Sequence, residues 1–236
     1  MSSPEADDLE PVTRESTPAI IADRLRGAIM RGWFPPGAQL GEVDLAGRLG
    51  VSRGPLREAM QRLVAEGLLR SERHRGLFVV DLGIDDVRDV YAARLAVEQA
   101  AARMVLRGDR STAAAELAMA QQSIVAAAAT GDPVALADAD QEFHTTLVRV
   151  SGSPRLQRMG QTLLVETRMC LTALQDTGPA PGDLVAEHRA LLDALRDGEG
   201  SRVPALLEEH MDGAVARIEE DLAGRDPDQG TVALAR

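Results

Sequence analysis

The chain has 236 residues, a formal net charge of −11 and one cysteine, Cys170. This length suits two small domains, and a lone cysteine excludes an intramolecular disulfide and fits a reducing cytoplasm. No apolar run approaches the length of a membrane span, and residues 1–16 lack the basic-then-apolar pattern of a secretory signal. We therefore expect a cytoplasmic protein without a membrane partner.

The charge is distributed unevenly along the chain. Residues 1–13 contain four acids and no arginine, whereas residues 14–80 contain eleven arginines against seven acids. Residues 81–236 contain fifteen arginines against 26 acids. The basic surplus therefore lies wholly within 14–80, where a surface that contacts phosphates is expected, and the acidic remainder should face away from nucleic acid.

The chain begins with an acidic segment rich in proline and serine, residues 1–16, which we expect to be disordered. The first helix is predicted from about Thr17 to Arg31, with Thr17 as the N-cap and Pro18 at the first helical position. Its buried stripe contains Ile21, Leu25, Ala28 and Ile29, and Gly32 with the following FPPG ends it.

Residues 44–80 have the pattern of a winged helix-turn-helix. A short helix ends at Gly50, and a second helix begins at Arg53 after Ser52, its predicted cap. Gly67 ends that helix, and the following segment predicts a β-hairpin with residues 73–76 at its tip. The domain that contains these elements is predicted to span residues 17–80.

The second helix of this motif has two distinct faces. Its apolar face contains Leu56, Ala59, Met60 and Leu63, and the opposite face contains Arg53, Gly54, Arg57 and Gln61. An ordinary amphipathic helix with a solvated charged face would give the same periodicity. The order of helix, turn, helix and wing instead favours a recognition helix that reads double-stranded DNA in the major groove.

After a linker at 81–84, the chain is predicted to form an antiparallel helical bundle over residues 85–222, followed by a loose tail at 223–236. Start and stop signals place six helices at about 85–107, 111–129, 132–150, 154–176, 182–196 and 202–222. The predicted fold class is mainly α, an N-terminal winged helix-turn-helix followed by an all-α bundle.

Three of the four histidines lie in different predicted helices of the bundle, each on or beside an apolar stripe. They are His144, His188 and His210, and Asp140 lies one turn before the first. Three imidazoles and a carboxylate that meet in a core would form a metal site with open positions. Periodicity alone equally allows three separate core histidines, each with its own hydrogen-bond partner.

Arg94 lies among apolar residues on the first bundle helix, so its guanidinium should point inward. One interpretation is an ion pair with Glu98, four residues later. The other is a clamp for a bound carboxylate, which guanidinium holds in bidentate fashion. Both can hold together, with Glu98 orienting the arginine.

The N-terminal part resembles the GntR family of bacterial transcription regulators, through PPGAQLGEVDLAGRLGVSRGPLREAMQRLVAEGLL and HRGLFVV. The bundle resembles the FCD ligand-binding domain of the FadR-type branch, through YAARLAVEQAAARM, DADQEFHTTLVRVSGSPRLQ, EHRALLDAL and EHMDGA. The resemblance covers roughly residues 17–222, and six bundle helices resemble the shorter VanR-type subgroup.

The resemblance implies roles for the residues of the DNA-reading unit. Arg53 and Arg57 would contact operator bases or phosphates, and the wing tip, here His74 and Gly76, would enter the minor groove. The rest of the expected DNA-binding set is Arg48, Gln61 and Arg75. The common SRTP of the family is SRGP here, so Gly54 offers no hydroxyl to a phosphate and is not expected to be a contact.

In the bundle, the resemblance implies that Asp140, His144, His188 and His210 bind a divalent metal and that Arg94 binds an effector carboxylate. Zinc is expected, with nickel and manganese as alternatives. The implied protein is a homodimer that binds a pseudo-palindromic operator and responds to a small carboxylate metabolite, most commonly as a repressor.

Three alternatives remain open. A metal-dependent hydrolase fused to a DNA-binding domain could use the same tetrad, but no further motif supplies an obvious general base or substrate loop, so we do not expect an enzyme. A chromosome-organising protein would bind DNA with little sequence preference. A metal-free sensor of fatty acyl-CoA is the alternative within the family.

Overall fold

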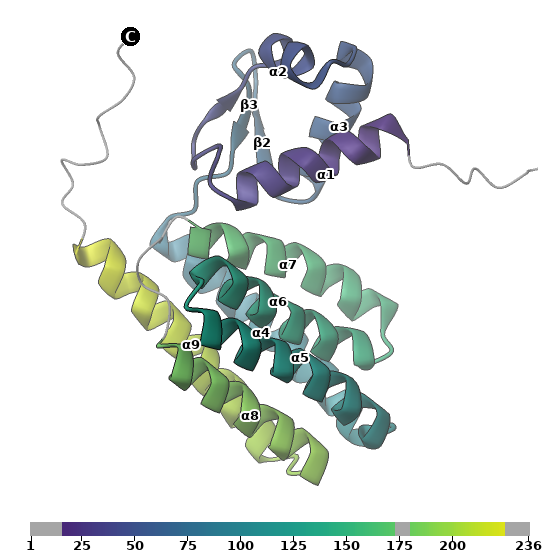
Figure 1. Cartoon of the computed structure of the whole chain (residues 1–236), viewed down its shortest axis with the longest axis vertical. Coiled ribbons are helices and arrows are strands. Elements are labelled where there is room, and N and C mark those ends of the chain that lie inside the picture. The colour runs from purple at the N-terminus through teal and green to yellow at the C-terminus, as the bar shows by residue number, and fades with distance from the viewer. Residues whose placement is uncertain (1–15, 173–179, 225–236) are drawn as a thin grey trace, which may run out of the picture.

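The computed structural model describes residues 16–172 and 180–224, which form two units (Figure 1). The elements of the first unit, which we call the winged-helix unit, are α1 Thr17–Met30, β1 Gln39–Leu40, α2 Glu42–Leu49, α3 Arg53–Ala65, β2 Leu69–Glu72 and β3 Gly76–Val79. The three strands form an antiparallel sheet in the order β1-β3-β2. The predicted helix-turn-helix and wing are therefore present, and the two-residue strand β1 is an addition that the sequence pattern did not indicate.

Local chemistry explains the ends of these helices. The N-cap of α1 is Ser16, whose hydroxyl accepts from the backbone N–H of Ala19, so the prediction of Thr17 as the cap was wrong by one residue. Gly50 ends α2 with a φ of +65°, which glycine adopts without steric cost. Ser52 is the N-cap of α3 by position, but its side chain makes no capping hydrogen bond. The predicted side-chain cap at this helix is therefore wrong.

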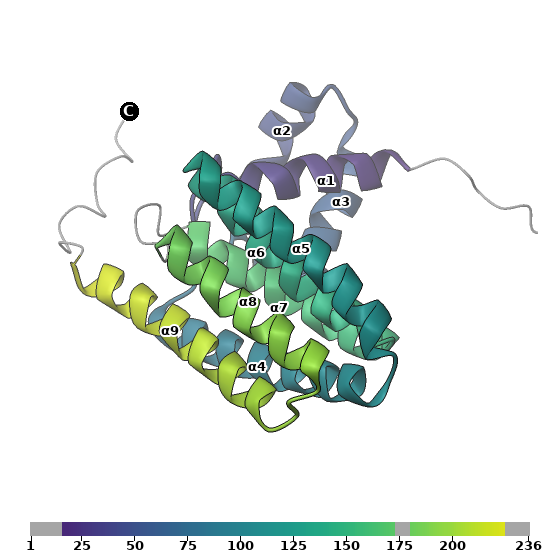
Figure 2. The same cartoon turned by 60° about the horizontal axis from the view of Figure 1, so that its bottom comes forward.

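The second unit, which we call the bundle, is all helical in its described residues (Figure 2). Its elements are α4 Ile84–Arg107, α5 Arg110–Thr130, α6 Pro133–Val150, α7 Pro154–Thr172, α8 Pro181–Asp197 and α9 Arg202–Gly224. These helices and the winged-helix unit confirm the predicted mainly α fold class.

The predicted helix starts differ slightly from those of the structure. The cap of α5 is Asp109, whose carboxylate accepts from the backbone N–H groups of Ser111 and Thr112. Ser111 is therefore inside the helix rather than at its start. Asp132 caps α6 as expected, with Pro133 at the first helical position, where its missing N–H has no cost.

The predicted tails fall mostly outside the described residues. Of the segment 1–16, the structure describes Ser16 alone, and it describes nothing of residues 173–176 at the predicted end of the fourth bundle helix. Helix α9 continues to Gly224, two residues into the segment predicted as a loose tail.

The largest core of the bundle is aliphatic, with Phe143 as its one aromatic ring among the described residues. Leucine, alanine and isoleucine from α5, α6, α8 and α9 surround it, including Leu117, Ile124, Leu191 and Leu207. Burial of such side chains stabilises the bundle, and the same core encloses the helix faces that carry the histidines. No helix in the described ranges is long and apolar enough to span a membrane.

Candidate metal centre and DNA-reading surface

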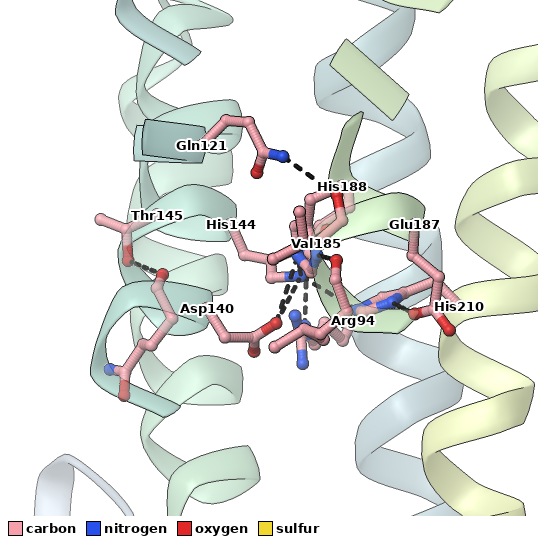
Figure 3. Close-up of polar contacts among 12 residues, drawn as sticks. Arg94, Gln121, Asp140, His144, Thr145, Val185, Glu187, His188 and His210 are labelled. Carbon is pink, nitrogen blue, oxygen red and sulfur yellow. Dashed lines mark hydrogen bonds and ion pairs between the residues drawn. The ribbon is translucent and has the colours of Figure 1, made fainter. Parts of the chain in front are cut away.

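The side chains of Asp140, His144, His188 and His210 meet inside the bundle. Asp140 and His144 lie one turn apart on α6, while His188 comes from α8 and His210 from α9. One nitrogen or oxygen atom of each lies within 4.8 Å of the corresponding atom of every other (Figure 3). Tertiary packing thus brings together all four residues of the predicted tetrad.

The atoms that face one another are the three Nε2 nitrogens and one carboxylate oxygen. His144 Nε2 lies 3.1 Å from both His188 Nε2 and His210 Nε2. Asp140 Oδ1 lies 3.2 Å from His188 Nε2 and 3.7 Å from His144 Nε2, but it makes no aligned hydrogen bond although it is buried. The histidine rings are almost completely buried, and the Asp140 side chain is partly exposed.

The outer nitrogen of each ring has an oxygen partner. The pairs are His144 Nδ1 with Glu98 Oε2 at 2.6 Å, His188 Nδ1 with the Leu184 carbonyl oxygen at 2.8 Å, and His210 Nδ1 with Glu187 Oε2 at 2.7 Å. A carbonyl or ionised carboxylate accepts and cannot donate, so each Nδ1 carries the ring proton. In the neutral rings, each Nε2 therefore directs a lone pair toward the centre.

The electrostatics differ between two of the rings. Burial lowers the pKa of His188, but the adjacent Asp140 carboxylate outweighs that effect and raises it. Burial and the nearby Arg94 guanidinium lower the pKa of His144 to about 4, so this ring is neutral near pH 7. Burial opposes ionisation of Asp140, but the neighbouring imidazoles nonetheless hold its pKa far below the usual range. The carboxylate is therefore ionised and acceptor-only.

These groups fit a divalent cation. Three Nε2 nitrogens and the Asp140 carboxylate oxygen face one centre, where a divalent cation would take the place of a proton between His188 and Asp140. Imidazole and carboxylate are ligands of zinc, nickel and manganese, and an oxygen partner on the second ring nitrogen is usual for metal-bound histidine. The alternative of three unrelated core histidines does not describe this arrangement, because the rings share one centre.

Arg94 lies beside the cluster on α4, with its side chain buried (Figure 3). Its Nε donates to Glu98 Oε1 over 2.6 Å, as expected from the four-residue spacing, and its guanidinium carbon lies 5.7 Å from the centre of the Tyr91 ring. Its Nη2 is buried without a hydrogen-bond partner. This nitrogen is a donor available to an anion.

Glu98 connects the arginine to the tetrad, because its two oxygens accept from Arg94 and His144. Burial raises the pKa of Glu98, but His144 and Arg94 outweigh that effect and hold it at about 2. The spacing from Arg94 was visible in the sequence, whereas the contact with His144, 46 residues away, was not. The sequence also offered no signal that Glu187, next to His188, would instead contact His210 on α9.

The predicted DNA-reading residues all lie on exposed parts of the winged-helix unit. Arg53, Arg57 and Gln61 share the outer face of α3, and the inner face of that helix is fully buried. Arg57 Nε contacts Glu42 Oε2 at 2.7 Å, which ties α3 to α2, whereas Arg53 makes no ion pair in the described part of the chain.

The remaining predicted DNA contacts lie at the wing and at the end of α2. Arg48 lies 3.6 Å from Asp44, and Arg75 pairs with Glu72 beneath the wing tip. His74 has a φ of +64°, the one non-glycine residue with a positive φ in the described segments. With Gly76 at +109°, this left-handed backbone forms the tight turn that joins β2 to β3.

Comparisons with known proteins place the two units in known families. Residues 19–79 match the family of bacterial regulatory proteins called the gntR family, and residues 89–213 match the FCD domain. The chain is 31% identical over 224 residues to the HTH-type transcriptional regulator BphR of Paraburkholderia xenovorans, covering 90% of this chain and 91% of that one.

Two further similarities extend over most of the chain. A probable D-xylose utilization operon transcriptional repressor of Paenarthrobacter nicotinovorans is 30% identical, covering 85% of this chain and 88% of the relative. The crystal structure of a putative GntR transcriptional regulator from Rhodococcus sp. RHA1 superimposes with a TM-score of 0.77 at 30% identity, covering 90% of this chain and all of the other.

Proposed function

Because the chain belongs to the GntR family of bacterial regulatory proteins and carries an FCD domain, we propose that it is a metal-dependent repressor released by a small carboxylate. Its function as a DNA-binding transcriptional regulator with a ligand-binding domain follows from the family. One observation supports the further step: the Asp140 carboxylate and three Nε2 nitrogens share a centre beside the unpartnered Nη2 of Arg94.

The proposed effector site combines two kinds of attraction. A divalent ion held by Asp140, His144, His188 and His210 would offer open coordination positions to a carboxylate oxygen. Arg94 Nη2 would donate to the same carboxylate, because Glu98 occupies Nε and leaves this nitrogen without a partner. A charge-assisted bond inside a buried site favours a small acid over a neutral molecule of similar size.

The proposed operator contacts lie on the winged-helix unit. Arg53, Arg57 and Gln61 would face base edges in the major groove, with Arg48 near the backbone. The exposed wing tip formed by His74, Arg75 and Gly76 would reach the minor groove. Two such units in a dimer would read the two halves of a pseudo-palindromic site.

The proposed dimer needs a self-complementary surface, and the outer face of α5 is our candidate. No charged residue occurs between 117 and 131, and Met119 is 70% exposed and Val125 42% exposed. An uncharged helix face with large exposed apolar side chains is typical of an interaction surface. We propose that a second copy covers this face and that the two bundles form the homodimer.

Ligand control requires two arrangements of the protein with different affinities for the acid. In the proposed repressor, the acid-bound arrangement places the two recognition helices at a spacing that does not match the operator. The name of the xylose-operon relative, a probable repressor, supports release of the operator rather than its binding in response to the acid.

The six helices of the bundle's described part support assignment to the VanR-like subgroup.

The decisive experiment compares the purified protein with a His144→Ala/His188→Ala variant. We expect the natural protein to contain about one equivalent of a divalent metal, zinc first, and to leave its operator when a panel of short-chain carboxylic acids is titrated. The double variant should lose both the metal and the acid response but still bind operator DNA. His74→Ala is the matched control, because this exposed histidine is outside the cluster and the variant should keep its metal.

Other outcomes would identify the alternatives. A protein without metal, whose melting temperature does not respond to added zinc, would contradict the metal centre; release by acyl-CoA alone would then indicate a metal-free sensor. Turnover of an added acid, abolished in the double variant, would indicate a hydrolase. Diffuse protection of DNA at moderate salt would indicate a chromosome-organising protein.

A further inference from the structure

The last described turn of α7 contacts both units of the protein. Helix α7 packs against α4 and α6 within the bundle. Among the described element pairs in substantial contact, α1 with α7 is the pair that joins the winged-helix unit to the bundle. Any rearrangement of the bundle that moves α7 therefore acts directly on the winged-helix unit.

Met169 forms the apolar part of this contact. It is 6% exposed and belongs to the core of the winged-helix unit, together with Ile21, Leu25 and Leu63. Val165, one turn earlier on α7, packs against the same core. A bundle residue thus completes the core on which the recognition helix α3 rests.

A second contact between the two units, from Gly67 to the side chain of Glu166, lies next to this apolar contact. A Cβ atom placed on Gly67, between α3 and β2, would lie 2.9 Å from Glu166 Oε1 of α7. Gly67 thus leaves room for the Glu166 carboxylate where a larger residue would displace it. The α3–β2 corner therefore lies against the side chain of Glu166 on α7.

The residues on either side of Met169 contact the helices that carry the metal tetrad. Arg168 Nη2 lies 2.7 Å from Asp138 Oδ1 on α6, two residues before Asp140. Cys170 belongs to a cluster with Tyr91 of α4 and Met211 of α9. Met211 directly follows His210, and Tyr91 lies one turn before Arg94.

We propose that the turn Arg168–Cys170 of α7 couples the metal and effector site to the winged-helix unit. Met169 is the residue that transmits the movement. This inference rests on the proposed metal site. Drawing Asp140 and His210 toward one ion moves α6 and α9 against α7, and close-packed helices respond by small concerted shifts rather than by compression. Met169 carries that shift into the core beneath α3.

Hydrogen exchange of the full chain, with zinc alone as the probe, tests the coupling. Zinc added to metal-stripped protein should slow exchange in peptides of α6 and α9, and also by about threefold or more in peptides of α1 and α3. In Met169→Ala, zinc should still protect α6 and α9 but should no longer protect α1 and α3. Met159→Ala is the matched control, because Met159 lies on the same helix but is 54% exposed, and this variant should behave as the natural protein.

A second pair of variants covers the case in which Met169→Ala does not fold. Met169→Leu conserves volume and should retain the protection of α1 and α3. Asp138→Asn changes an exposed side chain and removes the charge that Arg168 meets, so it should weaken that protection while zinc binding persists.

The possible failures are distinguishable. Zinc protection of α1 and α3 that persists undiminished in Met169→Ala, or in Asp138→Asn if the first variant does not fold, overturns the coupling and leaves the metal site intact. Protection of α6 and α9 without any effect on α1 and α3 in the natural protein also overturns the coupling. Absence of zinc protection in α6 and α9 overturns the proposed metal site and this inference with it.

Discussion

Glu98 on α4 and His144 on α6 lie 2.6 Å apart through Oε2 and Nδ1, with both side chains buried. This contact fixes the ring proton on the outer nitrogen and leaves Nε2 directed at the centre of the tetrad. The same carboxylate holds Arg94 through its other oxygen. Glu98 therefore orients both His144, a proposed metal ligand, and Arg94, the residue proposed to bind the effector.

Substitution of this acid should weaken metal binding without removing a ligand. We expect Glu98→Gln to lower zinc affinity by about 10- to 100-fold, because an amide accepts less strongly from His144 and lets the ring reorient. A competition titration with a zinc chelator measures the change. Glu116→Gln, in the exposed pair with Arg149, is the control and should leave affinity unchanged. Equal affinities in all three proteins would show that Glu98 does not orient the metal ligand.

Arg53 should contribute more to operator recognition than Arg62 of the same helix. Its replacement by alanine should cost about 1–3 kcal/mol of specific binding free energy, as loss of a base contact does. Fluorescence anisotropy with labelled operator measures this loss. Arg62→Ala is the control, because Arg62 lies half a turn away around α3 and pairs with Glu58. Unchanged affinity in Arg53→Ala would remove Arg53 from the set of DNA contacts.

A charge introduced on the exposed apolar face of α5 should disrupt the proposed dimer. Met119→Glu places a carboxylate at the proposed dimer interface, where its desolvation is unfavourable, so we expect a monomer with reduced operator affinity. Light scattering after size-exclusion chromatography measures the mass. Met159→Glu, at another exposed methionine, should keep the mass of the natural protein. A Met119→Glu protein that remains dimeric would place the interface elsewhere.

Replacement of Gly67 by alanine should destabilise the protein more than the same replacement at another glycine with a positive φ. Gly67→Ala has two costs, about 1–2 kcal/mol for a non-glycine residue at φ +79° and a smaller one for displacement of the Glu166 side chain. Gly50→Ala is the control, since its φ is +65° but nothing lies within 4 Å of the added carbon. Denaturant unfolding should therefore show a larger loss for Gly67→Ala. The added substitution Glu166→Ala should remove the excess, and persistence of the excess would contradict this account.

Cys170 should be chemically inert in the folded protein. Burial raises the pKa of its thiol from 9.0 to about 12, so little reactive thiolate forms at pH 8 and thiol reagents should label only unfolded protein. The unfolded chain ionises this thiol first, so the free energy of unfolding should fall as pH rises from 9 toward 12, by up to about 1.4 kcal/mol per unit. In Cys170→Ala this part of the pH dependence should vanish. Rapid labelling of the native protein would contradict the burial.

Local patterns in the sequence were sufficient for most of the fold. The apolar period along α3, the glycine at position 50 and the proline starts of α6 and α7 each act within a few residues, and the structure has these elements where they were expected. The predictions that failed are the cap at Thr17, the helix start at residue 111 and the capping bond of Ser52, and they concern which of several adjacent polar groups forms a bond. Such choices depend on side-chain geometry that a residue pattern does not contain.

The sequence by itself determined that three histidines and an aspartate lie on inward helix faces, because helical periodicity assigns each residue to a face. Only the tertiary structure decided that these faces share one centre, since convergence depends on how α6, α8 and α9 cross. The same holds for Glu98 with His144 and for Glu187 with His210, whose partners come from other helices. It also holds for Met169, which reads as an ordinary bundle residue and instead completes the core beneath the recognition helix.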